Sequence, residues 1–171
     1  SLTFSTVNDL SRYSSTSTTL GYWNFNTYSS VFDDASSNNR DLTTVGSATI
    51  TSSNGGKMGE GLELQGSNDY AWNNNGNAID LDADWSMEAW VNLDSNSDGT
   101  IIFVGNKDDG SEGSSGEFSW SFKSGGDMHV GYDDCSSSLD TESMSSANVD
   151  ANEWHHVAIA YDHSKKDIYG Y

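Results

Sequence analysis

The chain has no proline, one cysteine, and only seven lysine and arginine residues among 171. Its 26 acidic residues give a formal net charge of −19. Nucleic acids and anionic membrane surfaces are therefore excluded as partners, because both require basic patches on the protein. The single cysteine, Cys135, cannot form an internal disulfide. No apolar run approaches the length of a membrane helix, so we expect no insertion into a membrane.

Aromatic residues and turn-forming residues are abundant instead. Six Trp, eight Tyr and six Phe suit a core of large flat side chains packed between sheets. Seventeen Gly residues, together with Ser, Thr, Asn and Asp between the apolar runs, indicate short strands joined by many turns. At this length, one domain can bury a hydrophobic core.

Residues 152–169 carry the clearest strand pattern. The alternation places Val157, Ile159 and Tyr161 on one face and His156, Ala158 and Ala160 on the other. A polar turn follows over residues 162–166, and the next apolar residues begin at Ile168. We therefore predict a β-hairpin here.

Three further patterns organise the rest of the chain, two of them pairs of segments and one a single strand. Residues 117–123 and 128–132 flank Gly125-Gly126 and predict a hairpin. Residues 41–45 and 48–51 flank Gly46 and predict a second, smaller hairpin. Residues 86–93 alternate, with Met87, Ala89, Val91 and Leu93 on one face and Glu88 and Trp90 on the other. The pattern assigns five tryptophans to the core, namely Trp23, Trp85, Trp90, Trp120 and Trp154.

No segment shows a sustained helical period, so helices of at most a single turn are expected. About ten strands at regular spacing predict an all-β fold, an antiparallel two-sheet sandwich or jelly roll. Residues 1–19 contain eleven Ser or Thr and few apolar residues, which indicates an arm or linker. The sandwich is expected to occupy residues 20–171.

Four segments together resemble laminin G-like domains of the concanavalin A-like lectin/glucanase superfamily. The late signature is Trp-His-His-Val-Ala at residues 154–158, followed by Tyr161-Asp162. The upstream segments, in the same order as in the family, are residues 21–25 with Asp33-Asp34 and 38–42, residues 56–70, and residues 85–91. The resemblance implies a concanavalin A-like sandwich. It implies little about function, because this fold hosts many unrelated functions.

The family's domain normally continues with further strands, so the sandwich is expected to lack its last strands at Tyr171. An unfinished sheet exposes an unpaired edge. Either the chain continues, or a neighbouring subunit supplies the edge.

Oxygen-rich loops make calcium the metal to consider, because calcium takes six to eight oxygen ligands. The first candidate site contains Asp33, Asp34, Asn38 and Asp41, in a loop that resembles a cation-binding turn of the family. Ser37 stands where that turn usually has Gly. The second contains Asn68 and Asp69. The alternatives are an Asx-rich turn and an acidic surface that keeps the protein soluble.

Exposed aromatic residues beside amides and carboxylates are candidates for sugar binding. Trp72 with Asn73 and Asn74 is one such group, and Tyr132 with Asp133 is another. The alternative for Trp72 is a place inside the sandwich.

A catalytic function is not expected. Glycan hydrolysis needs two carboxylates facing one sugar bond, and the family's acidic motif Glu-x-Asp-x-x-Glu is absent. Glu60 and Glu63 fall on opposite faces of a strand, and Asp80, Asp82 and Asp84 lie in a polar turn. His155 and His156 are adjacent strand residues that face opposite ways, which favours packing over metal ligation.

The sequence therefore predicts a non-catalytic recognition or adhesion module. It would bind a glycan or a surface protein, with calcium as a stabilising cofactor, at an extracellular, cell or virion surface. The alternative is a structural subunit of a fibre, surface layer or virion, which would contact neighbouring subunits through its arm and open edge.

Overall fold

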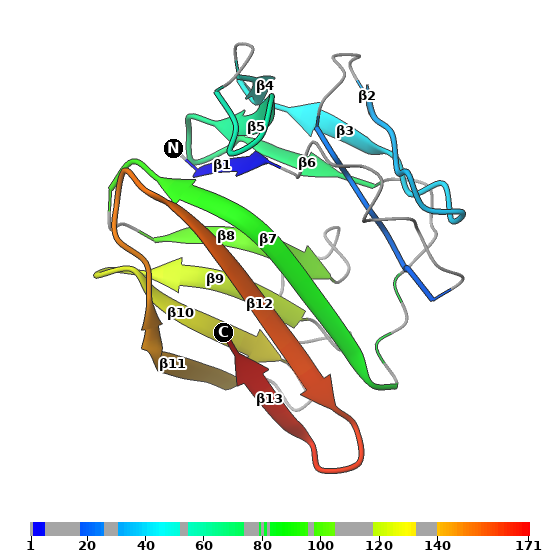
Figure 1. Ribbon diagram of the computed structural model, residues 1–171, viewed down its shortest axis with the longest axis vertical. Helices are drawn as coiled ribbons and strands as arrows, with labels where there is room; N and C mark the ends of the chain where they lie inside the picture. Colours follow the sequence, from blue (N-terminus) through cyan, green and yellow to red (C-terminus); the bar gives the residue numbers. More distant parts are fainter. Residues whose placement is uncertain are drawn as a thin grey trace.

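The computed structural model describes residues 2–5, 18–25, 31–51, 55–73, 79, 81, 83–95, 98–104, 118–132 and 140–171. All regular structure in these residues is β-strand (Figure 1). The strands are β1 Leu2–Ser5, β2 Val31–Phe32, β3 Leu42–Val45, β4 Thr49–Ile50, β5 Gly61–Leu64, β6 Tyr70–Trp72, β7 Trp85–Leu93, β8 Gly99–Val104, β9 Phe118–Lys123, β10 Asp127–Tyr132, β11 Asp140–Asn148, β12 Trp154–Asp162 and β13 Asp167–Gly170.

The largest sheet has six strands in the order β13-β12-β7-β1-β5-β4. Its longest pairing joins β7 and β12 antiparallel, from Trp154 opposite Asn92 to Tyr161 opposite Trp85. β12 and β13 form the predicted hairpin, with Asp162 opposite Asp167 next to the turn. The strong alternation of β7 and β12 thus fixes the register of this pair.

A second sheet has four strands in the order β11-β10-β9-β8. The predicted hairpin of β9 and β10 is confirmed, and it turns at Gly125 and Gly126, which both have positive φ angles. A Cβ on Gly126 would lie 2.2 Å from the carbonyl oxygen of Val149, so the turn packs too closely for a side chain. The edge strand β11 was not predicted, because its sequence from Asp140 to Asn148 is almost entirely polar.

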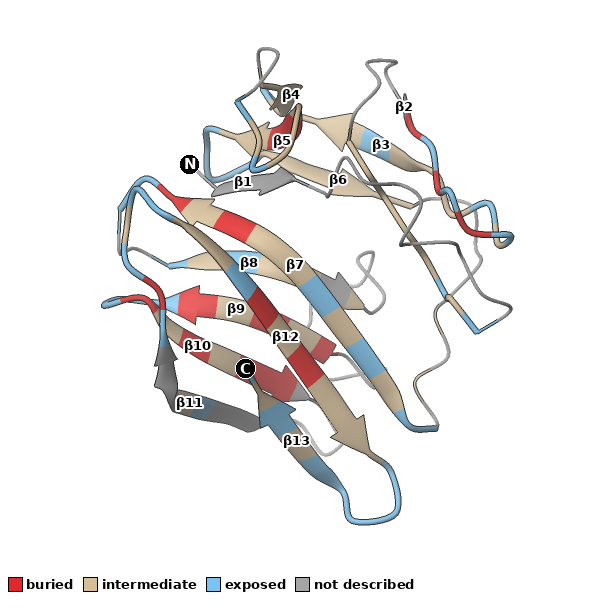
Figure 2. Cartoon of the chain, viewed as in Figure 1, coloured by how far each residue is buried: buried red, intermediate tan, exposed pale blue. Residues whose placement is uncertain are grey.

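The core lies between these two sheets (Figure 2). The six-stranded sheet contributes fully buried Val91 and Ile159, and the four-stranded sheet contributes Trp120 and Phe122. The buried residues of β7 and β12 all belong to the predicted faces that contain Val91 and Ile159, and the other residues of those faces are half-buried. This is the alternation expected of a sheet with one covered face. The prediction of an antiparallel sandwich is confirmed.

A third sheet, in the order β2-β3-β6, was not predicted. The proposed hairpin around Gly46 is wrong: β3 pairs with β2 and β6, whereas β4 pairs with β5 in the six-stranded sheet. The turn itself exists, with Gly46 at φ +74°. Runs of four residues carry too little pattern to indicate their partner strands. The chain crosses here from one sheet to another, where the sequence predicted a hairpin.

The expected arm also differs from the structure in its first residues. Leu2–Ser5 forms β1, which lies inside the six-stranded sheet and pairs antiparallel with both β5 and β7. The Ser/Thr content of residues 1–19 predicted a linker, but four residues suffice for a strand when both neighbouring strands offer free backbone groups. Residues 6–17 lie outside the described residues.

Candidate functional site

The outward-facing side of β7, β12 and β13 carries a group of aromatic side chains. Trp90 of β7 is the direct cross-strand partner of His156 of β12. Directly paired residues on neighbouring strands share a face of the sheet. Because Val91 and Val157, the next residues along, are buried, Trp90 and His156 face away from the core.

β13 extends this group to the edge of the sheet. Tyr169 pairs with Ala160, and Tyr171 exchanges two backbone hydrogen bonds with Ala158, of 2.9 and 3.0 Å. Both tyrosines are exposed, Tyr169 by 40% and Tyr171 by 71%. We refer to Trp90, His156, Tyr169 and Tyr171 as the aromatic strip.

Gly170 explains why the two tyrosines face solvent. It lies between them in the sequence and therefore faces inward, toward the four-stranded sheet. A Cβ at this position would lie 2.3 Å from Sδ of Met144 and 2.7 Å from Cε of Met128. The backbone of β13 thus packs directly on the core, and Tyr169 and Tyr171 lie on the opposite side.

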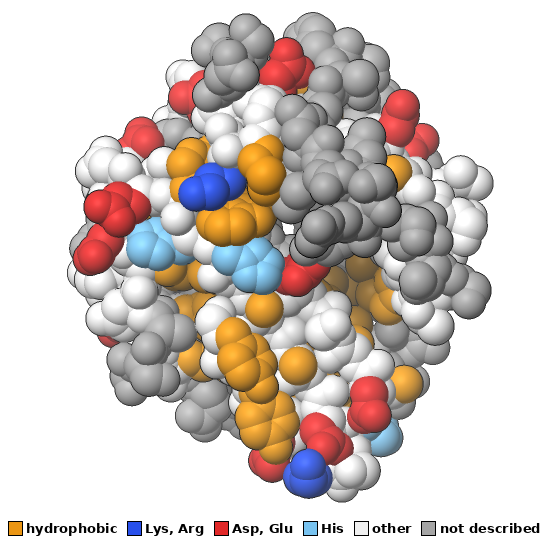
Figure 3. Space-filling view, viewed as in Figure 1, with side chains coloured by type: hydrophobic (Ala, Val, Ile, Leu, Met, Phe, Trp, Pro, Cys, Tyr) orange, Lys and Arg blue, Asp and Glu red, His pale blue; other side chains and the backbone are white. Residues whose placement is uncertain are grey.

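Charged groups border the strip at Trp90. The ammonium of Lys57 lies 4.7 Å from the centre of the Trp90 ring, a cation–π contact. The His156 ring lies 5.2 Å from the same indole at a tilt of 53°. Nε2 of His156 also lies 3.4 Å from a carboxylate oxygen of Glu88, the outward-facing residue two positions before Trp90. Figure 3 shows hydrophobic side chains and histidines gathered on this face next to a basic group, with acidic side chains around them.

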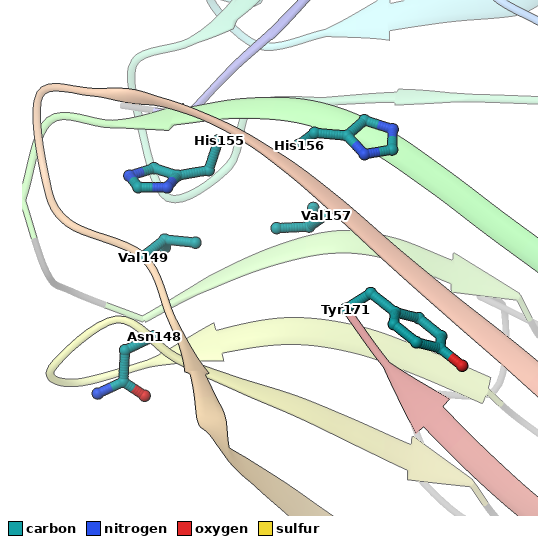
Figure 4. Close-up of a pocket in the computed structure, with 6 residues that line it drawn as sticks. All are labelled: Asn148, Val149, His155, His156, Val157 and Tyr171. Carbon is teal, nitrogen blue, oxygen red and sulfur yellow. The ribbon is translucent and has the colours of Figure 1, made fainter.

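A shallow hollow of about 100 Å³ adjoins the strip. His156 and Tyr171 line both features, and the other lining residues are Asn148, Val149, His155 and Val157. Figure 4 shows Val149 and Val157 pointing toward each other in its middle. His155 lies within hydrogen-bonding distance of the carbonyl oxygen of Asp150, at 3.2 Å, so its ring is fixed next to the hollow. The opposite orientation of the two histidines agrees with the alternation of β12.

The first predicted calcium loop is organised by hydrogen bonds to Asp34. Its Oδ1 accepts from the backbone N–H groups of Tyr22 and Ser36, both at 2.9 Å. Its Oδ2 accepts from the Ser36 hydroxyl at 2.7 Å and from the Arg40 N–H at 2.9 Å. The Asp34 N–H in turn donates to Asp41 at 2.9 Å. Four donors around one carboxylate leave Asp34 poorly suited to ligate calcium.

The same contacts set the acidity of Asp34, whose side chain is buried. Burial alone would raise the pKa of this carboxyl. The hydrogen bonds from Tyr22, Arg40 and Ser36 outweigh that effect and hold the pKa below its usual value. Asp34 is therefore ionised, and its carboxylate holds the loop together through these hydrogen bonds.

The other candidate calcium ligands of this loop differ in what they contact. Asp33 is exposed, and Asn38 donates from its amide to the carbonyl oxygen of Thr19 at 2.8 Å. Throughout the described ranges, no three His, Cys, Asp or Glu side chains are grouped so that they could hold a metal ion. Calcium binding by this loop stays a prediction, which depends on Asp33 rather than on Asp34.

The second candidate loop uses Asp69 to join two turns. Its Oδ1 accepts from the Ser47 N–H at 2.6 Å, and its Oδ2 accepts from the Gln65 N–H at 3.0 Å. A Cβ on Gly46 would lie 2.2 Å from Oδ1, so the close approach requires glycine. Asn68 is exposed beside it. Asp69 thus connects the turn after β3 with the turn after β5.

Of the residues predicted to bind sugar, the structure describes the side chains of Trp72 and Asn73. Trp72 is half-buried at the end of β6, and Asn73 donates to the carbonyl oxygen of Asp41 at 2.9 Å. Asn74 and Asp133 lie outside the described residues. Tyr132 ends β10, where the structure describes only the backbone.

The aromatic strip was missed, and Trp90 was wrongly assigned to the core. The alternation of β7 already placed it with Glu88, opposite Met87 and Val91. The pattern Tyr169-Gly-Tyr171, with two aromatic residues at strand spacing around a glycine, was the available signal for an exposed aromatic face.

Comparison with known families agrees with this architecture. Residues 64–170 match the Laminin_G_3 family, described as the concanavalin A-like lectin/glucanases superfamily. The match covers more than half of the chain, and the protein belongs to this family. No curated protein and no solved structure gave a match. The described part of the chain contains no helix that is long and apolar enough to span a membrane.

Proposed function

We propose that this chain is a non-catalytic recognition module that binds a glycan through the aromatic strip. The observation that carries the proposal is the exposure of Tyr169 and Tyr171 in line with His156 and Trp90, across three neighbouring strands. Sugar rings present flat C–H faces that pack against aromatic rings, while their hydroxyl groups need polar partners at the edge. Glu88 and His156 supply such partners.

The surface next to the aromatic strip is also open to a flat ligand. Ala158 and Ala160, the outward-facing residues of β12 next to the tyrosines, are small, so a flat ligand can approach the sheet closely. Exposed aromatic side chains that gather on one face mark an interaction site more often than isolated ones do. Membership in a family of lectin-like sandwiches supports a glycan as the partner.

Binding without hydrolysis is the expected activity. Retaining glycan hydrolysis needs two carboxylates about 5 Å apart. Among the described residues, two carboxylates border the strip: Glu88 beside His156, and Asp167, which accepts a hydrogen bond from Tyr169 at 3.3 Å. Their partners on β12 are four positions apart, so the two carboxylates are separated by roughly 13 Å along the strand and cannot face one sugar bond. We place the module at an extracellular, cell or virion surface, where glycans are presented.

A glycan array probed with the whole chain tests the proposal. We expect binding to a restricted set of glycans and loss of this binding in Tyr169→Ala. Binding that is unchanged in Tyr169→Ala would move the site elsewhere. The absence of any bound glycan, together with concentration-dependent self-association, would favour the structural-subunit alternative.

A further inference from the structure

The strands β11 and β13 are edge strands of two different sheets, and they lie side by side (Figure 1). Each has one paired neighbour, β10 for β11 and β12 for β13. The contact between them is made at Gly170 of β13, where an added Cβ would meet Sδ of Met144 on β11 and, at 2.7 Å, Cε of Met128 on β10. The backbone of β13 therefore packs directly on two methionine side chains.

The two methionines form a pair across β10 and β11. Met128 lies directly opposite Met144, so both side chains share the face that turns toward the core. Met128 is fully buried, whereas Met144, on the edge strand, is half-buried. The register of the two strands shifts next to this pair, because Asp127 lies opposite Asn148. Such an irregularity at a sheet edge leaves β11 less regularly paired beside Met144.

We propose that Met144 is an oxidation-sensitive contact that holds β13 against the four-stranded sheet. Hydrogen peroxide would oxidise its thioether to a sulfoxide. The sulfur lone pair attacks one peroxide oxygen, an S–O bond forms as the O–O bond breaks, and the second oxygen leaves as water with both protons. The sulfur loses two electrons and the peroxide gains them. The proposal concerns the packing of β13 and holds whether or not the aromatic strip binds a glycan.

The space around Gly170 explains why the sulfoxide would release β13. Because a single added carbon on Gly170 would already meet Sδ of Met144, an added oxygen on Sδ has no room on that side. The oxygen is also a polar acceptor, and it would lie next to the buried, apolar side chain of Met128. Burying such a group without a hydrogen bond is unfavourable. β13 would therefore separate from β11, and the oxidised Met144 side chain would turn toward water.

Burial predicts the order in which the methionines react. Met144 is half-buried on an edge strand, so peroxide reaches it in the folded protein. Met128 has no exposed surface and is protected until β13 has moved. Met58, which is half-buried in the turn before β5, reacts independently of this contact. Oxidation of Met144 is therefore expected to precede and to accelerate oxidation of Met128.

Timed exposure of the whole chain to hydrogen peroxide, followed by peptide mass spectrometry and hydrogen exchange, tests the proposal. We expect Met144 to gain one oxygen about tenfold faster than Met128. The backbone amides of residues 167–171 should then exchange about tenfold faster in the fraction that carries oxidised Met144. Methionine sulfoxide reductases of both stereospecificities should restore slow exchange. Met144→Leu conserves apolar volume and cannot be oxidised, so it should keep exchange slow in peroxide, whereas the control Met58→Leu should not.

Oxidised Met144 with unchanged exchange over residues 167–171 would overturn the proposal. Accelerated exchange in peroxide-treated Met144→Leu would also overturn it, because another group would then be responsible. If Met144→Leu does not fold, the time course of the wild type decides. Faster exchange that follows the oxidation of Met58 or Met128, rather than that of Met144, would contradict the role of Met144.

Discussion

The imidazole of His156 lies 5.2 Å from the indole of Trp90, its direct partner across β12 and β7. This contact joins two neighbouring strands of the largest sheet on the side that faces solvent. It also brings together an aromatic surface, the carboxylate of Glu88 and the ammonium of Lys57.

Gly170→Ala tests how closely β13 packs on the second sheet. The added methyl group would meet the side chains of Met144 and Met128, and Met128 is fully buried. We expect a loss of about 1–3 kcal/mol in the free energy of unfolding, measured with chemical denaturant. Gly99→Ala is the matched control, because nothing lies within 4 Å of its Cβ, and it should change stability by less than about 0.5 kcal/mol. Equal stability of both variants would show that β13 does not pack this closely.

Asp34→Ala tests the hydrogen-bonded loop. Loss of the carboxylate leaves the N–H groups of Tyr22, Ser36 and Arg40 without their acceptor, which should cost about 3 kcal/mol. The pKa of Asp34 is lower in the folded state than in the unfolded state. Its stabilisation is therefore complete above about pH 4, where the unfolded carboxyl is also ionised, and is lost as the pH falls through the folded pKa.

Denaturant unfolding of the wild type and Asp34→Ala between pH 7 and pH 2 measures this dependence. The difference in stability between the two proteins should shrink below about pH 4. A difference that stays constant down to pH 2 would mean that the ionised carboxylate does not organise the loop.

The sequence predicted the long alternating strands better than the short or polar ones. The alternation of β7, β9 and β12 is long enough to specify which face is buried, and the hairpins around Gly125 and residues 162–166 connect neighbouring strands. β1 and β11 escaped prediction because their pairing depends on distant strands rather than on their own pattern. A strand as short as β1 or as polar as β11 acquires its partners only through the tertiary structure.

The candidate sites seen in the structure differ from the predicted ones for a similar reason. Oxygen-rich loops predicted calcium, but Asp34 and Asp69 bind backbone N–H groups from residues up to 22 positions away. A sequence cannot distinguish such a cap from a metal ligand, because both use the same carboxylate. The alternation of β7 and β13 shows which residues share a face. Only the structure shows which face is exposed, so the aromatic strip could not be assigned from the sequence.

Calcium binding at the first loop predicts a specific difference in thermal unfolding. A cation present at about 100 times its Kd would stabilise the folded state by about 2.7 kcal/mol, which raises the Tm by several degrees relative to excess EDTA. Asp33→Ala should remove this shift, since Asp33 is the exposed carboxylate of the loop. Identical melting in calcium and in EDTA would exclude calcium as a stabilising ion.

Asp69→Ala should behave differently from Asp33→Ala in the same two buffers. Its carboxylate accepts hydrogen bonds from Ser47 and Gln65, which do not depend on a cation. We expect a loss of about 1–2 kcal/mol in EDTA and in calcium alike. A loss confined to the calcium buffer would instead identify Asp69 as a calcium ligand.

The affinity of Tyr169 variants for the glycan that binds best on an array tests the central claim most directly. Tyr169→Phe keeps the aromatic ring, and Tyr169→Ala removes it from a side chain that is 40% exposed, so both should fold like the wild type. We predict that calorimetry gives at least about tenfold weaker binding for Tyr169→Ala and a change within about twofold for Tyr169→Phe. Equal affinity of all three proteins would contradict glycan recognition by the aromatic strip.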